Sequence, residues 1–440
     1  MGNREAAAHL LRRTTFGPTA AQVDAAERAG VDATLAALLA PTGPDLGAAA
    51  TPIPALGPDP YAALSGKSTR EQRQQAQQQR RQQVQTITQW WISRLVAADH
   101  QLSEKLVFFW HGHWATSVQK VKSAALMLRQ QETFRRYGRG DFGVLVTAMV
   151  HDPALIFWLD GQRSTRQAPN ENLARELMEL FTLGIGNYTE DDVKAGARAL
   201  TGWVVERTSG EARFNQRRHD SEPKTIFGRT AAFDADSYAD LLVRQPASAT
   251  FLARRLWFRF GSGEPMTAAT EQRLTSAYGA GRDVTALLRA LFRDPAFAGT
   301  AGGLVKQPVE WAVGAMRQLG ITVTALDGQS RKQLTNVANG LDQVLFRPPS
   351  VGGWPAGTAW LTTSSTQARL RAAAVLAGLA STTVLDRLAA APAAGRVDAL
   401  ARLLVVDRWT DRSRAVLTPA VGNIRQLLTF GLVSPEYAVH

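Results

Sequence analysis

Apolar residues recur at helical spacing along most of the chain, and this pattern predicts a mainly α-helical protein. Two short helices are expected over residues 5–40, interrupted at Gly17-Pro18, and helical spacing dominates again up to residue 150. Strand signals are scarce. Only residues 202–227, where short apolar runs alternate with polar turns, favour a small peripheral β-hairpin. We therefore expect a single large helical body.

A segment rich in Pro, Gly and Ala, residues 41–60, separates the first helices from the rest of the chain. This composition disfavours regular structure, so we assign residues 1–60 to N-terminal helices and a connector, and residues 61–440 to a helical main domain. The main domain begins with residues 70–85, which are dense in Gln and Arg and lack an apolar stripe. They predict an exposed helix start that runs into the apolar residues 87–96.

Two stretches of the main domain repeat one pattern, in which a helix is followed by Asp-Pro. Asp141 and Asp283 occupy equivalent positions in the two copies. Because the residue before proline avoids the helical conformation, each copy predicts a helix that stops at Asp-Pro. We expect duplicated helical units at about residues 100–160 and 250–300. An aromatic run continues into His-Gly-His in the first copy and into Gly-Ser-Gly in the second, so we place any chemistry in the first copy.

The amino-acid composition excludes several classes of protein. Hydrophobic residues make up 45% and charged residues 20% of the 440 positions, as in a soluble globular protein, and no apolar run is long enough for a transmembrane segment. The absence of cysteine excludes a disulfide scaffold, a thiolate zinc site and a cysteine nucleophile. The first residues lack a secretory leader pattern, so we expect a cytoplasmic protein as written, or an exported one if a leader was trimmed.

The chain is strongly basic, with a formal net charge of +12. Such a charge favours anionic ligands, and nucleic-acid binding is the less favoured explanation. The densest group of cations lies between residues 120 and 139, where a solvated helix face is the favoured interpretation. This basic cluster consists of Lys120, Lys122, Arg129, Arg135, Arg136 and Arg139.

Histidines provide the first candidate chemistry. His111 and His113 form an H-x-H pair after an aromatic run. On an extended or turning segment such a pair can bind one divalent metal with both rings, whereas on a helix the two positions face about 200° apart. His219 and Asp220 are a second pair that could supply further ligands, followed by Lys224. The alternative is that these residues cap helices or occupy a surface loop.

The segment from Asn170 to Gly184 is the most unusual part of the sequence. As a helix it places carboxylate, amide and guanidinium groups on one face, and apolar residues fill more than half of the circumference. One interpretation is an ordinary amphipathic helix with ion pairs around Arg175. The other is a stripe lining a cleft, where Glu176 and Glu179 titrate apart and act as acid and base.

Six strings of the sequence, in this order along nearly the whole chain, resemble the bacterial family catalogued as domain of unknown function 1800. They are HLLRRTTFGPT, FFWHGHWATS, HDPALIFWLDG, NENLARELMELFTLGIGNYTEDDV, RALTGW and RPPSVGGWPAGTAW. The resemblance implies no particular reaction. It does imply that members are often exported, and often encoded beside a sulfatase-like or phosphatase-like protein. The polar positions within the family strings and the nearby His-Asp pair are His111, His113, Asn170, Glu171, Asn172, Arg175, Glu176, Glu179, His219, Asp220, Lys224, Arg347 and Trp354.

Our leading hypothesis is a hydrolase-like enzyme that acts on an anionic or carbohydrate-type substrate, either metal-assisted or by acid/base catalysis. The expected catalytic residues are His111, His113, Glu176 and Glu179. The expected substrate-binding residues are Asn172, Arg175, Lys224, Arg347 and Trp354. The tentative metal ligands are His111, His113, His219 and Asp220. Two alternatives stay open: a non-catalytic helical scaffold or partner-binding protein whose polar cluster is structural, and a protein that binds nucleic acid through the basic cluster.

Overall fold

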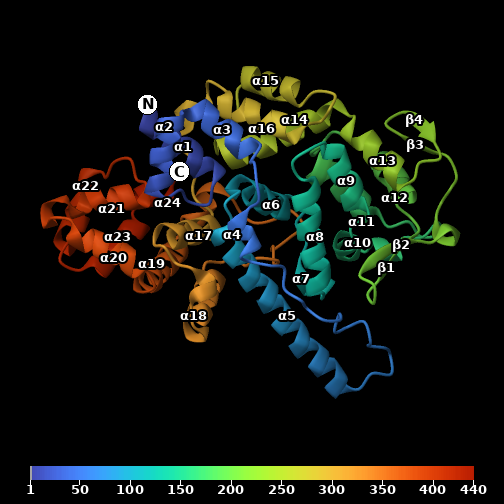
Figure 1. The fold of residues 1–440 in the computed structure, drawn as a ribbon. Coiled ribbons are helices and arrows are strands. Elements are labelled where there is room, and N and C mark those ends of the chain that lie inside the picture. The colour runs from blue at the N-terminus through green and yellow to red at the C-terminus, as the bar shows by residue number, and fades with distance from the viewer. Residues whose placement is uncertain (1) are drawn as a thin grey trace.

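The structure is a computed structural model that describes residues 2–440 (Figure 1). Over those residues the chain forms 24 α-helices and two two-stranded antiparallel sheets. The mainly α-helical fold class predicted from the sequence is confirmed. Within the same residues no single helix is both long and apolar enough to cross a membrane. Helices α19 (Thr363–Gly378) and α20 (Thr382–Ala390) meet the length and composition criteria only together, across a bend of 91°.

The first part of the chain supplies much of the core. Its helices are α1 (Asn3–Thr14), α2 (Ala20–Ala29), α3 (Val31–Leu39), α4 (Leu46–Ala49), α5 (Arg70–Ala97), α6 (Gln101–His113), α7 (Val118–Val121), α8 (Ala124–Tyr137), α9 (Phe142–Val150) and α10 (Pro153–Trp158). Leu10, Phe16, Leu35 and Leu39 of the N-terminal segment belong to the same buried cluster as the main body. The N-terminal helices therefore pack into the body, and the connector holds one short helix, α4.

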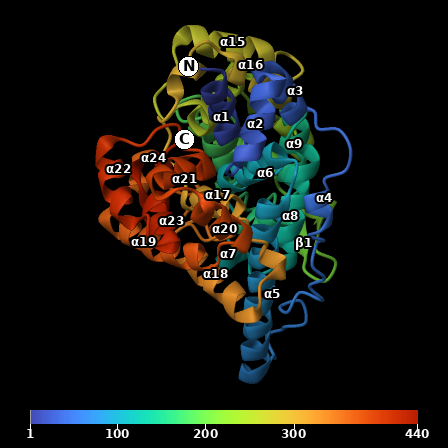
Figure 2. The same cartoon turned by 60° about the vertical axis from the view of Figure 1, so that its left-hand side comes forward.

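Helix α5 begins as an exposed helix, as predicted. Thr69 caps its first turn, together with the side chain of Gln72. In its first half only Ala76 is buried, and this end projects away from the other helices (Figures 1 and 2). Its second half carries Trp90 and Trp91 into the core.

The middle of the chain holds both sheets and two π-helical turns. Its elements are α11 (Glu171–Glu176), the π-helix η2 (Leu177–Thr182), α12 (Glu190–Ala199), β1 (Trp203–Glu206), β2 (Glu211–Phe214), β3 (Lys224–Ile226), β4 (Arg229–Ala231), α13 (Ala235–Val243), α14 (Pro246–Leu256), the π-helix η4 (Trp257–Gly261), α15 (Ala268–Tyr278) and α16 (Val284–Arg293). Strand β1 pairs with β2 with Trp203 opposite Phe214, which is the predicted hairpin. A second hairpin, β3–β4, lies beside α12.

The two copies of the repeated pattern meet in space. Asp141 and Asp283 each cap the helix that follows, α9 and α16. The two aspartates also face each other in an antiparallel bridge. In this bridge the N–H of Phe142 donates to the carbonyl of Arg282 at 3.0 Å. Positions that are equivalent in the sequence are thus joined in the fold.

The last part of the chain packs against the first part. Its helices are α17 (Pro308–Gln318), α18 (Gly328–Gly340), α19 (Thr363–Gly378), α20 (Thr382–Ala390), α21 (Arg396–Leu404), α22 (Asp411–Leu417), α23 (Ile424–Val433) and α24 (Pro435–Ala438). Gly314 of α17 touches the chain near α1, because a Cβ there would lie 2.6 Å from the carbonyl oxygen of Phe16. The two chain ends lie near each other on this side of the molecule (Figure 1).

Candidate functional site

His111 and His113 lie in the last turn of α6, which agrees with the interpretation that they end a helix and not with an extended or turning H-x-H segment. Residues two apart on a helix point in different directions and cannot bind one metal together. The run of apolar residues before them continues the helix to the end, because Phe109, Trp110 and Trp114 pack in the core.

His111 has a partner at each ring nitrogen. Its Nε2 accepts a hydrogen bond from the N–H of Phe346 at 3.1 Å, and its Nδ1 lies 3.0 Å from the side-chain amide of Gln131. Burial lowers the pKa of His111 to about 3, so the ring is neutral. With both nitrogens occupied, the ring has no free lone pair for a metal or a proton, and its visible role is to hold the segment at residue 346 against α6.

His113 is different, because only one of its nitrogens has a partner. Its Nε2 donates to the carbonyl oxygen of Phe181 at 2.9 Å. Its Nδ1 is buried and has no hydrogen-bond partner in the described chain. Burial, assisted by the charge of Arg255, lowers the pKa of His113 to about 3. The ring is therefore neutral, with Nδ1 as a bare acceptor.

His113 borders a cavity of about 80 Å³ between α6, the junction of α14 with η4, and the segment around Trp354. We call this cavity the arginine pocket. Its lining residues are Phe108, Phe109, Gly112, His113, Arg255, Phe258, Arg259, Gln307, Gly352, Trp354 and Ala356. No carboxylate is among them, so the lining is apolar, amide and cationic.

The segment around Gly353 packs closely against α6. Gly353 has a φ of +86°, and a Cβ there would lie 2.5 Å from the carbonyl oxygen of Gly112. This close approach places the ring of Trp354 at 5.1 Å from that of His111. The structure thus brings together three of the predicted site residues, His111, His113 and Trp354, from parts of the chain more than 200 residues apart.

The two arginines of the pocket differ in how they are held. Arg259 lies 2.7 Å from the buried carboxylate of Glu310. Arg255 forms no ion pair and no hydrogen bond with any described residue, and its Nε is buried. Burial lowers the pKa of Arg255, although an arginine stays charged. Its neighbour Arg254 points outward and pairs with Glu271.

The pocket has a second donor without a partner. The indole Nε1 of Trp354 is buried and lacks a hydrogen-bond acceptor in residues 2–440. Buried donors are almost always satisfied in native proteins. The unpaired guanidinium of Arg255 at the cavity therefore points to an acceptor that arrives with a ligand or with water.

The predicted polar stripe of residues 170–184 lies apart from this pocket and is partly exposed. Arg175 binds Glu190 through two hydrogen bonds of 2.7 Å and binds Glu171 at 3.2 Å. None of these residues lines the arginine pocket. The pairs around Arg175 match the amphipathic-helix interpretation, with Glu190 as an additional partner.

Glu176 and Glu179 nevertheless form an unusual pair. Burial, reinforced by the charge of Glu179, raises the pKa of Glu176. Tyr188 donates to Glu179 at 2.5 Å, and burial together with that carboxylate raises the pKa of Tyr188 to about 12. The π-helical turn η2, which begins at Leu177, sets the relative direction of the two glutamates. The two carboxyl groups of this pair thus have different surroundings at a half-buried surface.

His219, Asp220 and Lys224 have structural partners. His219 Nδ1 donates to the carbonyl oxygen of Thr201 at 3.0 Å, and Asp220 binds Arg198 at 2.6 Å. Lys224 is buried, and its ammonium donates to the carbonyl oxygens of Asp220 and Glu222. These contacts fold the loop before β3 onto α12.

The four predicted metal ligands are not assembled. Across residues 2–440 no group of three or more His, Asp or Glu side chains has the geometry to hold a metal ion. Asn172 and Arg347 are exposed, and neither borders the arginine pocket. Of the predicted site residues, therefore, only His113 and Trp354 line the arginine pocket, with His111 beside Trp354.

Three of the six cations in the basic cluster have carboxylate partners. Arg135 binds Glu104 and Glu132, and Lys120 binds Asp160. Arg129 lies near Glu211, and Arg139 donates to Ser103. These pairings reduce the free positive charge that a nucleic-acid interface would need.

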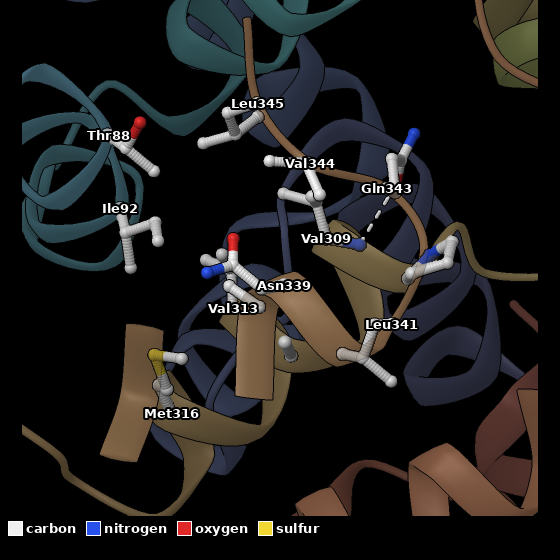
Figure 3. A pocket seen from close by; sticks show the side chains of 13 residues that line it. Thr88, Ile92, Val309, Val313, Met316, Asn339, Leu341, Gln343, Val344 and Leu345 are labelled. Carbon is white, nitrogen blue, oxygen red and sulfur yellow. Dashed lines mark hydrogen bonds between the residues drawn. The ribbon is translucent and has the colours of Figure 1, made fainter. Parts of the chain in front are cut away.

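Another cavity, between α5, α17 and α18, is a poor candidate for a site (Figure 3). It measures about 20 Å³ and is lined mainly by apolar side chains such as Ile92, Val313 and Met316. Its polar group Gln343 is already engaged, because its oxygen accepts from the N–H of Val309 at 3.0 Å. The cavity has room for roughly one water molecule, which is too little for a substrate.

Comparison with known families agrees with the resemblance seen in the sequence. Residues 9–439 match the model of the family described as protein of unknown function DUF1800. The chain belongs to the DUF1800 family. No curated protein and no solved structure matches it.

Two functional candidates of this DUF1800 member escaped the sequence analysis. Arg255 and Arg259 lie on the second copy of the repeated pattern, whereas chemistry was expected in the first. The spacing of four residues could have shown that both lie on one helix face. Nothing in the sequence indicates that this face meets His113, because the contact depends on tertiary packing.

Proposed function

We propose that this protein binds a small anionic ligand in the arginine pocket. The observation that carries the proposal is Arg255, a half-buried side chain with no carboxylate or carbonyl partner at a cavity without acidic lining. Leaving such a charge unpaired is costly, and a bound anion would remove that cost. Guanidinium groups are well suited to bind phosphate, sulfate or carboxylate through two parallel hydrogen bonds.

The surrounding residues support the same proposal. Arg259, which pairs with Glu310, lines the same cavity and adds a second guanidinium group. Phe258, at the rim, is 41% exposed, which offers an apolar surface beside the anion site. An anionic substrate was also expected from the basic composition of the chain.

The test is calorimetric titration of the protein with inorganic phosphate, sulfate and acetate. Arg255→Gln should weaken binding of the best anion at least tenfold, because it removes the unpaired charge. Arg254→Gln is the matched control, since its side chain is adjacent in sequence but points outward to Glu271. Equal binding by both variants, or no binding by the wild type, would refute the proposal.

A hydrolytic role is the second candidate, and the asymmetric pair of Glu176 and Glu179 favours it. A carboxyl group with a raised pKa beside a second carboxyl group suits general acid/base catalysis. If the protein hydrolyses esters of the anion it binds, Glu176→Gln should reduce kcat by two orders of magnitude or more. Glu190→Gln, which removes only a partner of Arg175, should leave kcat unchanged. Unchanged turnover in Glu176→Gln would remove this residue from the mechanism.

A further inference from the structure

The arginine pocket is lined by several phenyl and indole rings, and two of these rings are already covered. The guanidinium of Arg259 lies 5.5 Å from the ring centre of Phe108. Phe109 is buried and packs against Trp110 and Phe260, at ring-centre distances of 4.7 and 6.0 Å. The open apolar surface of the pocket therefore comes from other rings.

Phe258 and Trp354 are the rings of the pocket that keep open surface. Phe258 is 41% exposed, and among the described phenylalanines only Phe214 is exposed as well. The ring of Phe214 packs against Trp203 at 5.4 Å. Trp354 is half-buried, and the exposed part of its ring is hydrocarbon, because Nε1 is buried. Both rings thus offer carbon surface at the pocket.

Arg255 supplies the charged group beside these rings. Of its three side-chain nitrogens only Nε is fully buried, so the two terminal nitrogens keep accessible surface, and no described residue binds them. Arg259, in contrast, is bound by Glu310 at 2.7 Å. Arg255 and Phe258 are three residues apart, across the junction of α14 with η4, and both line the cavity. One available guanidinium therefore lies close to an apolar rim.

The size of the cavity limits what it encloses. Its volume of about 80 Å³ corresponds to roughly five or six water-sized spheres. This is enough for a carboxylate or phosphate group but not for a complete aromatic ring in addition. A ring attached to such a group would extend to the rim, where Phe258 is exposed. A free inorganic anion would leave the rim in contact with water.

We infer that the ligand is an aromatic oxyanion, in which a carboxylate or phosphate group is joined to an aromatic ring. The inference rests on the proposed anion-binding function of the arginine pocket. The oxyanion would accept hydrogen bonds from Arg255, while the ring packs against Phe258 and the exposed edge of Trp354. Burying apolar surface stabilises a complex in proportion to its area, and pairs of aromatic rings add to this effect.

The first experiment is calorimetry of the wild-type protein with two pairs of anions, acetate with benzoate and hydrogen phosphate with phenyl phosphate. In mildly alkaline buffer the two members of each pair carry the same charge. We expect the aromatic member to bind at least about tenfold more tightly than the simple anion. Equal or weaker binding by both aromatic members overturns the inference but leaves the anion-binding proposal intact. Absence of binding by all four anions overturns both.

Cyclohexanecarboxylate distinguishes an aromatic ring from apolar bulk. It has the same charge and the same number of carbon atoms as benzoate, but its ring is not flat and has no π-system. Benzoate should bind about threefold more tightly, because only an aromatic ring forms stacked or edge-to-face pairs with Phe258 and Trp354. Equal or tighter binding of cyclohexanecarboxylate would contradict the assignment of an aromatic ligand.

A pair of variants places the ring of the ligand at the rim. Phe258→Ala should weaken benzoate binding about fivefold or more and leave the affinity for the simple anions unchanged. Phe214→Ala is the matched control, because Phe214 is similarly exposed, at 44%, and lies outside the pocket. It should bind benzoate like the wild type. Wild-type affinity for benzoate in Phe258→Ala, or equal losses in the two variants, would contradict the inference.

A last variant tests whether the ring and the charge act at one site. Arg255→Gln should weaken the binding of benzoate and of the simple anions alike, each by at least about tenfold. Benzoate that still binds Arg255→Gln with wild-type affinity would be held without the guanidinium, and this result would overturn the inference.

Discussion

The hydrogen bond between His113 and Phe181 determines which ring nitrogen of His113 carries the proton. Phe181 lies in the π-helical turn η2, so the acceptor is supplied by a different part of the chain. His111, two residues earlier, has both nitrogens occupied and illustrates the opposite outcome. A histidine-rich motif thus divides into one structural ring and one ring with a free lone pair, and the division depends on partners that lie far away in the sequence.

Asp152 is a buried carboxyl group whose ionisation should limit stability at neutral pH. Burial raises its pKa to about 6, whereas the ordinary value in an unfolded chain is about 4. The folded state therefore favours the protonated form, and stability should fall as the pH rises from about 4 to 6 and then level off. Asp152→Asn keeps the helix cap of α10 and removes the charge.

We expect Asp152→Asn to be more stable than the wild type at pH 8, by roughly 1–3 kcal/mol, and about equally stable at pH 4. Denaturant unfolding at both pH values measures this difference. Asp141→Asn is a suitable control. Asp141 also caps a helix, but it pairs with Arg282, so its substitution should destabilise the protein. An unchanged pH dependence in Asp152→Asn would show that another group causes it.

At the scale of elements, the docking of the segment around Gly353 onto the end of α6 completes the arginine pocket. Gly353→Ala should break this contact, because it adds a methyl group 2.5 Å from the carbonyl of Gly112 at a φ that disfavours side chains. We expect a loss of about 2–4 kcal/mol in the free energy of unfolding, and a loss of anion binding.

Gly357→Ala is the matched control for this substitution. Gly357 also has a positive φ, of +61°, but an added Cβ there meets no atom within 4 Å. It should cost about 1 kcal/mol and leave anion affinity unchanged. Thermal unfolding and calorimetry on both variants separate the contact from the backbone strain. Similar losses in the two variants would contradict the proposed role of the contact.

Local patterns in the sequence predicted many of the secondary-structure elements. The hairpin near residue 203, the exposed start of α5 and the Asp-Pro boundaries were all predictable, because each depends on alternation, polarity or proline. The end of α6 was not, since the helical state of His111 and His113 is set by the aromatic core around them. The pocket was even harder to predict from the sequence. Adjacent arginines at 254 and 255 look alike in the sequence, and only the packing of α14 makes one external and one internal.

At the scale of the molecule, one buried carboxylate connects remote parts of the chain. Glu310 of α17 binds Lys105 of α6 and Arg259 of η4, and it lies 3.9 Å from His440 near the C-terminal end. Although burial opposes it, Arg259 and Lys105 hold the pKa of Glu310 well below its usual range. The ion cluster therefore supports both the packing of the body and the floor of the pocket.

Glu310→Gln should destabilise the protein by about 3–5 kcal/mol, because it leaves buried cations without a counter-charge. Denaturant unfolding at neutral pH checks this value. Glu271→Gln, which removes an exposed carboxylate from Arg254, should cost less than about 1 kcal/mol. If Glu310→Gln also lowered the free energy of unfolding by less than about 1 kcal/mol, water or a bound anion would have to replace the carboxylate.

The most direct test of the central claim is to locate an anion in the protein. Arsenate has the shape and the proton of hydrogen phosphate, and its anomalous scattering identifies it in a crystal. The account predicts one strong arsenic peak in the arginine pocket, within hydrogen-bond distance of Arg255, and no peak there in the Arg255→Gln variant. A crystal soaked at saturating arsenate with an empty pocket, or with its peak at another site, would contradict the account.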